Sequence, residues 1–499
     1  MTAVINAGSV PGDVPAQAAQ LAAAETGLST SRNLKIGFFH LGSGMADILA
    51  TGIWNRIMIS DLGFSATPIS ILAALRYFLA PLGIWAGRQS DQRAIGGYRR
   101  LFWIWLGRAM MVISVLGLGF STASVAQSGV RGEASIAQWL GLAGSMILFS
   151  LGNALSGSTF LALIYDRARE DQRGRAVGIV WTFLLIGFTV GGIFFGIFLP
   201  SGSTPMDIAS FNPEIVAQHF GHGLLRFSPL VVLNLFGIAA LTLGSLWFFS
   251  LIGEERRSQG AVTGAAGGEH QPSLMGDLRL AWSNPQTRFF FWYLALSMAF
   301  AFSQDAILEP FAGDVLGMEA RITTRFSGYW GSMAILATIV FLILGRRFKW
   351  LNNTRMNWLG VGLLVGAFAI FALSSLAAIR GLVTPGLIVL GLGLGIWNVG
   401  TLGMMMDMSP FGRAGTFLGF WTLVVTLARG MGVSSGGIVR DLALSLSGDP
   451  RIAYGAVFVI GAVGLAVSLY ALAHVNVRRF KQESERAPEA AQVFAAAID

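Results

Sequence analysis

The sequence predicts an all-α membrane protein with twelve transmembrane helices arranged as two halves of six. Its 499 residues are 54% hydrophobic and only 12% charged, with a mean hydropathy of +0.64. A soluble domain usually carries about 25% charged residues. Apolar runs long enough to cross a bilayer recur along the chain, and one long polar interruption, residues 253–287, divides them into two equal sets.

A transmembrane helix needs about 20 predominantly apolar residues. In chain order the predicted spans lie near residues 35–60, 66–87, 101–122, 137–164, 175–199, 229–252, 289–311, 325–345, 357–379, 385–408, 414–437 and 452–474. The predicted domains are a disordered cytoplasmic N-terminal tail at 1–34, a six-helix half at 35–252, a cytoplasmic linker at 253–287, a second six-helix half at 288–474 and a cytoplasmic C-terminal tail at 475–499.

The distribution of basic residues predicts which side of the membrane each loop faces. Most of the 34 Lys and Arg residues fall in the two tails and in the loops on the same side as the tails. Loops rich in Lys and Arg stay in the cytoplasm, so both termini are expected there. The same asymmetry explains the net charge of +8 as topology and lipid contact, and nucleic acid is not an expected partner. The absence of cysteine excludes disulfides, iron–sulfur clusters and thiolate metal sites.

Several charged residues lie within predicted spans, where an unpaired charge is costly. At about 1.5 Å per helical residue, Asp47 in the first span and Arg76 in the second both fall near the bilayer midplane. Asp305 in the seventh span and Arg429 in the eleventh fall at similar depths. We therefore expect two ion pairs, Asp47–Arg76 and Asp305–Arg429, which either stabilise helix packing or take part in proton coupling.

The stretch at 303–318, SQDAILEPFAGDVLGM, follows a long apolar run. Asp305 and Glu309 are four residues apart, so in a helix their carboxylates share one face. Pro310 is expected to end this helix, because proline lacks a backbone N–H. We interpret the two acids as a polar anchor at which the two halves meet or at which a partner docks.

A weak internal repeat indicates that the halves are related. Gly-Arg-Ala occurs after the fourth span, with Arg175 at its centre, and again after the tenth span, with Arg413 at its centre. A Trp-Thr pair follows each copy, at Trp181 and Trp421. Repeats at equivalent places in two halves are typical of major facilitator folds.

The loop after the second span contains a second indication of that fold. Gly87 and Asp91 resemble the G-x-x-x-D-R loop motif of major facilitators, although Gln92 replaces its first basic residue. In that motif the acid caps a neighbouring helix, and arginines join the helices of one half. The residues expected to be structural or gating are Gly87, Asp91, Arg76, Arg429, Arg175 and Arg413.

Several stretches together resemble one family. They are TGIWNRIM at 51–58, the loop around Asp91, RGRAVG at 173–178, D-x-x-L-E-P-F-x-G-x-V-L-G-M at 305–318, and MDMS at 406–409. This combination resembles the PucC/LhaA family of light-harvesting complex assembly proteins, a bacteriochlorophyll-delivery branch of the major facilitator superfamily. The resemblance extends over about 35–474.

The resemblance implies a non-enzymatic assembly factor in the inner, photosynthetic membrane of a bacterium. Its partners would be light-harvesting antenna polypeptides, bacteriochlorophyll and membrane lipid, with either the core or the peripheral antenna as client. Bacteriochlorophyll would be transient cargo, and the candidate contact residues are His40, Asp47, Asp305 and Glu309. A neutral imidazole can be an axial ligand to the magnesium of a chlorophyll; alternatively, His40 packs against neighbouring helices.

Two other function classes compete with this interpretation. A proton-coupled major facilitator transporter of a small hydrophobic solute would use Asp305 or Glu309 as its proton carrier. A prenyltransferase that attaches the pigment tail would need aspartate-rich motifs to hold Mg²⁺ and diphosphate. Asp407 has no carboxylate neighbour in the sequence, so an enzyme is not expected. The glycines from Gly391 to Gly395 favour close helix packing, although a flat macrocycle could also approach there.

Overall fold

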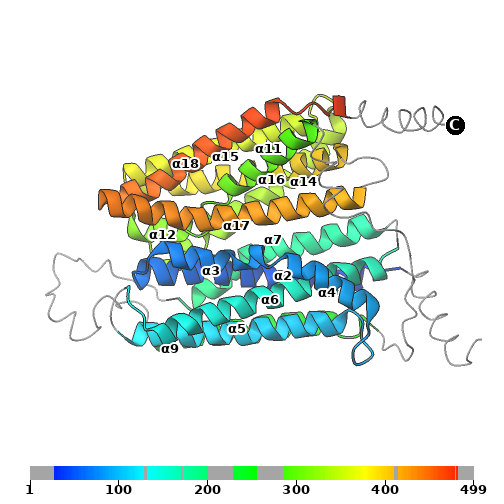
Figure 1. Cartoon of the computed structure of the whole chain (residues 1–499), viewed down its shortest axis with the longest axis horizontal. Coiled ribbons are helices and arrows are strands. Elements are labelled where there is room, and N and C mark those ends of the chain that lie inside the picture. The colour runs from blue at the N-terminus through cyan, green and yellow to red at the C-terminus, as the bar shows by residue number, and fades with distance from the viewer. Residues whose placement is uncertain are drawn as a thin grey trace, which may run out of the picture.

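The computed structural model describes residues 27–128, 132–169, 172–199, 229–255, 285–408, 414–477 and 479–480. These residues are helical and form no β-sheet; one isolated bridge, between Ile95 and Tyr98, closes a short loop. The long helices run side by side along one axis (Figure 1). The predicted all-α architecture is confirmed.

The first half begins with a transmembrane segment that is only partly α-helical. It starts as α2 (Thr30–Ile48) and continues through two π-helical segments, η1 (Leu49–Ile53) and η2 (Arg56–Asp61). The remaining helices of this half are α3 (Ala66–Phe78), α4 (Pro81–Gln92), α5 (Leu101–Gln127), α6 (Ile136–Arg167), α7 (Arg173–Ile197) and α9 (Pro229–Leu251). Together α3 and α4 make one crossing, with Pro81 in the first turn of α4, where its missing N–H leaves no helical bond unmade.

The second half also begins with an irregular segment. Its helices are α11 (Pro285–Ala301), α12 (Leu308–Asp314), α13 (Ala320–Thr323), α14 (Phe326–Arg347), α15 (Asn353–Leu376), the 3₁₀ turn η5 (Arg380–Leu382), α16 (Val383–Asp407), α17 (Ala414–Ser447) and α18 (Pro450–Ala473). Among the described residues, eleven helical segments are long and apolar enough to cross a membrane. The twelfth crossing is divided between α11 and α12, so each half has the six crossings that the sequence predicts.

The predicted continuous helix at 289–311 is wrong. The α-helix ends at Ala301, residues 302–307 form turns, and a new helix begins at Leu308. Pro310 does not end a helix but lies in the first turn of α12. Because its ring excludes a helical bond to the carbonyl of Ala306, the chain breaks before the proline instead of after it. Asp305 therefore lies in the turns at 302–307, whereas Glu309 lies in α12.

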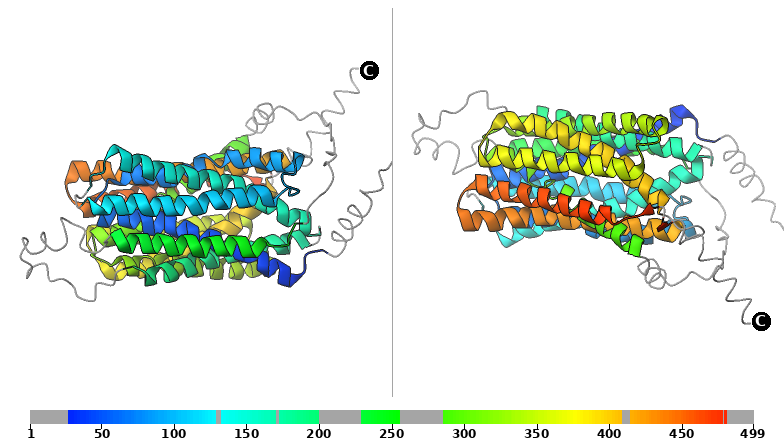
Figure 2. Two further views of the ribbon diagram at one scale, coloured as in Figure 1. Left: turned by 90° about the horizontal axis from the view of Figure 1, so that it is seen from below. Right: turned by 90° about the horizontal axis from the view of Figure 1, so that it is seen from above.

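Each half has its own hydrophobic core. One cluster of buried residues comes almost entirely from the chain before Gly253 and surrounds Trp54 and Trp247, and the other surrounds Tyr293 and Phe458 in the second half. Figure 2 shows the helices of the first half on one side of the molecule and those of the second half on the other. The halves contact each other mainly through α3 with α17 and α7 with α14.

Glycines allow the halves to approach closely at both contacts. A Cβ atom at Gly437 of α17 would overlap Ser70 Oγ of α3, and one at Gly192 of α7 would overlap the carbonyl oxygen of Thr324. The glycine run of α16 has the same role within the second half. A Cβ at Gly391 would overlap the carbonyl of Trp330 in α14, so the packing interpretation of that run is confirmed.

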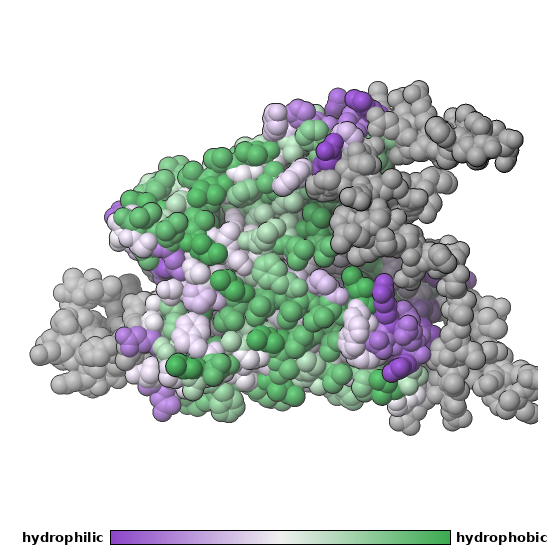
Figure 3. Space-filling view, viewed as in Figure 1, coloured by the Kyte–Doolittle hydropathy of each residue, from purple (hydrophilic) through white to green (hydrophobic). Residues whose placement is uncertain are grey.

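The two ends of the helix bundle contain different segments of the chain. We call the end with the start of α2 and the end of α18 the terminal end, on the right in Figure 1, and the opposite end the distal end. Figure 3 shows apolar side chains over the flank of the helices and more polar ones towards the ends. This distribution is that of a multi-pass membrane protein.

Candidate functional site

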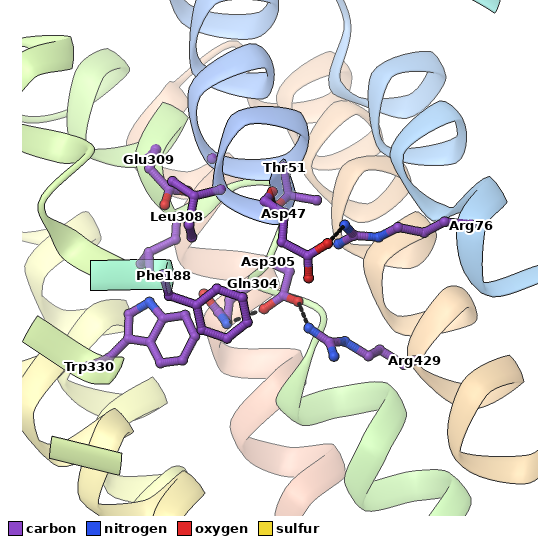
Figure 4. A pocket seen from close by; sticks show the side chains of 12 residues that line it. Asp47, Thr51, Arg76, Phe188, Gln304, Asp305, Leu308, Glu309, Trp330 and Arg429 are labelled. Carbon is purple, nitrogen blue, oxygen red and sulfur yellow. Dashed lines mark hydrogen bonds and ion pairs between the residues drawn. The ribbon is translucent and has the colours of Figure 1, made fainter. Parts of the chain in front are cut away.

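The two irregular segments cross at a pocket between the halves. This central pocket is lined by Asp47, Ile48, Thr51, Gly52, Arg76, Phe188, Gln304, Asp305, Leu308, Glu309, Trp330 and Arg429. It has space for only a few water molecules. Its walls come from α2 and η1, α3, α7, the break at 302–307, α12, α14 and α17, as Figure 4 shows for the labelled residues.

Both ion pairs expected from the sequence are present in the pocket (Figure 4). Arg76 Nη1 lies 2.6 Å from Asp47 Oδ1, and Arg429 Nη2 lies 3.1 Å from Asp305 Oδ2. Tyr77 lies between the two guanidinium groups. Its hydroxyl accepts a hydrogen bond of 2.7 Å from Arg76, and its ring centroid is 5.0 Å from Cζ of Arg429. Each pair lies within one half, and Tyr77 connects the two.

Glu309 differs from the other two carboxylates of the pocket. Its side chain is 7% exposed, and it forms no ion pair with any residue that the structure describes. Gly52 of η1 allows its approach, because a Cβ at that position would lie 3.2 Å from Glu309 Oε1. The sequence-predicted acids Asp305 and Glu309 thus line the same pocket, but only Asp305 has a basic partner.

A second polar group lies at the distal end, and we call it the distal cluster: Ser60, Asp314, Arg440, Asp441 and Tyr454. Asp314 is its centre. It pairs with Arg440 at 3.1 Å, accepts a hydrogen bond of 2.6 Å from the Tyr454 hydroxyl, and accepts a short one from Ser60. Ser60 belongs to the first half, so Asp314 joins the halves.

Asp441 joins the halves a second time. Its carboxylate accepts hydrogen bonds from the backbone N–H groups of Ala66 at 3.0 Å and Thr67 at 2.7 Å. These are free donors in the first turn of α3, so a residue of α17 caps a helix of the first half. Arg440 lies 2.8 Å from the same carboxylate and connects it to Asp314.

Two of the stretches that carry the family resemblance, 51–58 and 303–318, contact each other near the pocket and the distal cluster. Arg56, in the 51–58 stretch, donates a hydrogen bond of 3.1 Å to the carbonyl of Met318, in the 303–318 stretch, and pairs with Asp61 at 2.9 Å. A Cβ at Gly313 would overlap the Arg56 guanidinium and Ser60 Oγ. A side chain at position 313 would therefore require the arginine to shift.

The sequence interpretation missed the distal cluster. The predicted spans leave Asp314, Arg440 and Asp441 in loops, and sequence spacing assigns no role to Tyr454. One signal was available: Asp314, Arg440 and Asp441 lie at the ends of apolar runs, where acids and bases from different helices can meet. Their pairing joins residues more than a hundred positions apart, and neither sequence spacing nor span depth predicts it.

The loop motif at Gly87 and Asp91 makes its ionic contact within the first half, but a different acid caps the start of α5. Asp91 pairs with Arg100 at 2.5 Å, and Arg100 also contacts Asp166 at 2.9 Å. Burial alone would lower the pKa of the Arg100 guanidinium, but these carboxylates raise it above its ordinary value. Glu255, not Asp91, accepts hydrogen bonds from the first N–H groups of α5. The expected capping role of Asp91 is therefore wrong.

The other predicted residues lie away from the pocket. Arg175 is exposed near the start of α7 at the terminal end, and Arg413 falls outside the described residues. His40 is buried, with its ring centroid 4.8 Å from that of Phe160 and 5.9 Å from that of Trp181. Its Nδ1 atom is buried without a hydrogen-bond partner in the described residues. A ligand role for His40 stays a prediction.

Solved structures of similar fold are membrane transporters. A bacterial homologue of the human lysosomal transporter Spinster, inward-facing and unoccupied, has a TM-score of 0.65 and 16% identity, covering 91% of this chain and 98% of that one. A bacterial homologue of the iron transporter ferroportin, in an inward-facing state, has a TM-score of 0.61 and 15% identity, covering 88% and 99%. The likeness shows the fold, which is the major facilitator fold expected from the sequence.

Relatives by sequence extend over most of the chain. Protein PucC of Rhodovulum sulfidophilum is 28% identical over 426 residues, which is 84% of this chain and 87% of that protein. The bacteriochlorophyll synthase 44.5 kDa chain of Rhodobacter capsulatus is 30% identical over 431 residues, 85% of this chain and 90% of that protein. The sequence profile of the PUCC protein family matches residues 53–480, which include both halves and the whole distal cluster. The chain therefore belongs to the PucC family.

Proposed function

We propose that the chain is an assembly factor for bacterial light-harvesting antenna complexes. It would deliver or insert bacteriochlorophyll, antenna polypeptides or both within the membrane. The observation that carries this proposal is the family match, which extends through both halves and includes relatives named for PucC. Two of the stretches that carry the resemblance, one from each half, contact each other at Arg56, Gly313 and Met318, which supports a role of the two halves together.

The pigment would not occupy the central pocket in the conformation described here. That pocket has space for a few water molecules, whereas a bacteriochlorophyll carries a flat macrocycle and a long apolar tail. The apolar flanks of the helices offer a surface that suits such cargo (Figure 3). We therefore infer that cargo approaches from the lipid, and that a larger separation of the halves would be needed for it to reach Asp47 or Asp305.

The proposed location is the inner membrane of a photosynthetic bacterium, with the terminal end in the cytoplasm. Support comes from the basic residues of the terminal end, such as Arg93 and Arg347, and from the positive-inside rule. The chain has no cysteine, so single cysteines can be labelled without background. A cysteine replacing Gln92 should react only from the cytoplasmic side, and one replacing Glu133 only from the other side. The reverse pattern would contradict the orientation.

We propose no enzymatic role, although one relative is named as a bacteriochlorophyll synthase chain. Within the described residues, no group of three or more His, Cys, Asp or Glu side chains could hold a metal ion. A diphosphate-dependent transfer of the pigment tail would need such a group for its Mg²⁺. Incubation of the purified chain with bacteriochlorophyllide and a prenyl diphosphate should yield no esterified pigment.

The direct test is the absorption spectrum of the chain purified gently from its native membrane, with co-purifying polypeptides identified by mass spectrometry. Bacteriochlorophyll bands together with antenna polypeptides are expected. A purification of an unrelated major facilitator from the same membrane is the control for carried-over pigment. A colourless chain with no antenna polypeptide would contradict the proposal.

A proton-coupled transporter of a small hydrophobic solute is the second candidate. The transporter fold and the unpaired Glu309 favour it. It requires proton-linked flux in vesicles that contain the chain, abolished by Glu309→Gln or Asp305→Asn. If flux is found and antenna assembly proceeds without the chain, this candidate replaces the first.

A further inference from the structure

The charges of the central pocket do not balance. Its lining contains three carboxylates, on Asp47, Asp305 and Glu309, and two guanidinium groups, on Arg76 and Arg429. Each arginine is bound to one aspartate, at 2.6 and 3.1 Å. The carboxylate of Glu309 is the excess negative group. Figure 4 shows it on the side of the pocket away from both arginines.

No other described side chain compensates Glu309. The neighbouring charged groups are Asp47 of α2, Arg76 of α3, Asp305 of the break, Arg429 of α17 and Arg56 of η2. Arg56 is already bound to Asp61 and to the carbonyl of Met318. Phe188 of α7 and Trp330 of α14 contribute only aromatic rings, whose centroids are 5.7 Å apart. A lone ionised carboxylate that is 7% exposed among such groups is strongly disfavoured.

The backbone around Glu309 is irregular on both sides. The π-helical segment η1 contains Gly52, which faces the carboxylate, and the break at 302–307 comes directly before α12. Irregular backbone at membrane depth is found where it lines a cavity or a binding site. The irregularities of the first and seventh crossings therefore meet at the one carboxylate of the pocket that has no basic partner.

We propose that the Glu309 carboxyl group is a proton-binding site. In the arrangement described here, in which Glu309 is 7% exposed, the carboxylate and one proton form a neutral carboxylic acid. When the halves separate further and more water reaches Glu309, the acid releases that proton to water. The halves can then close on Glu309 only after it has taken up a proton. The two aspartates remain bound to their arginines throughout, so one proton is exchanged.

A proton fits this place better than a metal cation. Hard metal cations take about six or more oxygen ligands. Here Asp47 and Asp305 are already bound to arginines, and the pocket has space for only a few water molecules. Thr51 donates its hydroxyl hydrogen to the carbonyl of Asp47 and adds at most one more oxygen. The proposal does not depend on the assembly function and can be tested on the purified chain alone.

The test is infrared spectroscopy of the purified full-length chain in lipid nanodiscs across a pH series. A protonated carboxylic acid has a C=O stretching band that is separate from the bands of carboxylates and amides, and that shifts in D₂O. The wild-type chain should show this band at neutral pH and lose it at alkaline pH. Glu309→Gln should lack it, Glu309→Asp should retain it at a shifted frequency, and Glu133→Gln, at an exposed position, should not change it.

Three results would overturn the proposal. They are the absence of the band in the wild-type chain at neutral pH, an unchanged band in Glu309→Gln, and loss of the band on addition of sodium but not of choline, which would assign the site to a metal cation. Measurements on the wild-type chain decide the first and third of these even if Glu309→Gln folds poorly. Antenna assembly enters none of these measurements, so failure here leaves the proposed assembly function unaffected.

Discussion

The central pocket and the distal cluster use similar side chains in opposite ways. In the distal cluster, Asp314 and Asp441 pair with Arg440 of their own half and also accept hydrogen bonds from the first half, so the contacts of each carboxylate cross between the halves. In the pocket, the ion pairs of Asp47 and Asp305 stay within one half each, and Glu309 has no basic partner among the described residues. The distal contacts stabilise the association of the halves, whereas the pocket contains the Glu309 carboxyl group, which we propose binds and releases a proton.

The largest expected effect comes from breaking the distal cluster. Asp314→Asn should lower the melting temperature of the purified chain in detergent by the equivalent of about 3–5 kcal/mol, because the buried Arg440 loses one of its two carboxylates and the hydrogen bonds from Tyr454 and Ser60 weaken. The measurement is thermal unfolding followed by tryptophan fluorescence. Glu133→Gln is the control and should not change the melting temperature. An Asp314→Asn chain as stable as the wild type would show that the cluster does not hold the halves.

A somewhat smaller effect is expected from the close contact between the halves. Gly437→Ala should destabilise the chain by about 1–3 kcal/mol, because the added methyl group would overlap Ser70 of α3. Gly362→Ala on α15 is the matched control, since a Cβ there has open space. That variant should be neutral or slightly more stable. Equal stability of the two variants would place the contact between the halves elsewhere.

The coupling within the pocket is expected to be weaker again. A double-mutant cycle of Asp305→Asn and Arg429→Gln should give an interaction energy of about 0.5–3 kcal/mol. A cycle that combines Asp47→Asn with Asp305→Asn should give a smaller value, because the two pairs contact each other only through Tyr77. A larger value for the second cycle would mean that the pocket acts as one charge network across the halves.

The smallest effect concerns the loop motif. Gly87→Ala should leave the melting temperature unchanged, because a Cβ there would meet only Ser158 Cβ at 4.0 Å. Gly83→Ala, one helical turn earlier in α4, should lower it, because a Cβ there would lie 2.8 Å from the carbonyl oxygen of Ala154. If Gly87→Ala is the more damaging variant, the close contact of α4 with α6 is at the motif glycine after all.

The sequence was most informative where a single physical constraint applied. Apolar length set the number of crossings, and the cost of a buried charge predicted the Asp47–Arg76 and Asp305–Arg429 pairs from depth alone. The sequence predicts a helix that ends at Pro310, whereas the helix break lies before Pro310. A proline in the first turn of a helix is tolerated, and its effect falls on the preceding turn. Periodicity cannot distinguish these two outcomes within one apolar run.

Contacts that join distant segments of the chain could not be predicted in the same way. Asp441 caps α3, and Glu255 caps α5, from segments far away in the sequence. In the sequence, any acid at the end of a span could cap these helices. Asp441 and Glu255 do so because α17 packs against α3 and α9 packs against α5. The distal cluster depends on that packing: Asp314, Arg440 and Asp441 lie in predicted loops, whereas in the structure they belong to α12 and α17.

The proposed role of this chain in the assembly of light-harvesting complexes is best tested by deletion and complementation in its native bacterium. Antenna absorption of the membranes and antenna polypeptide content would be measured together, with the amount of chain quantified in each strain. We expect deletion to lower both quantities and the wild-type gene to restore both. Normal antenna absorption and polypeptide content in the deletion strain would contradict it.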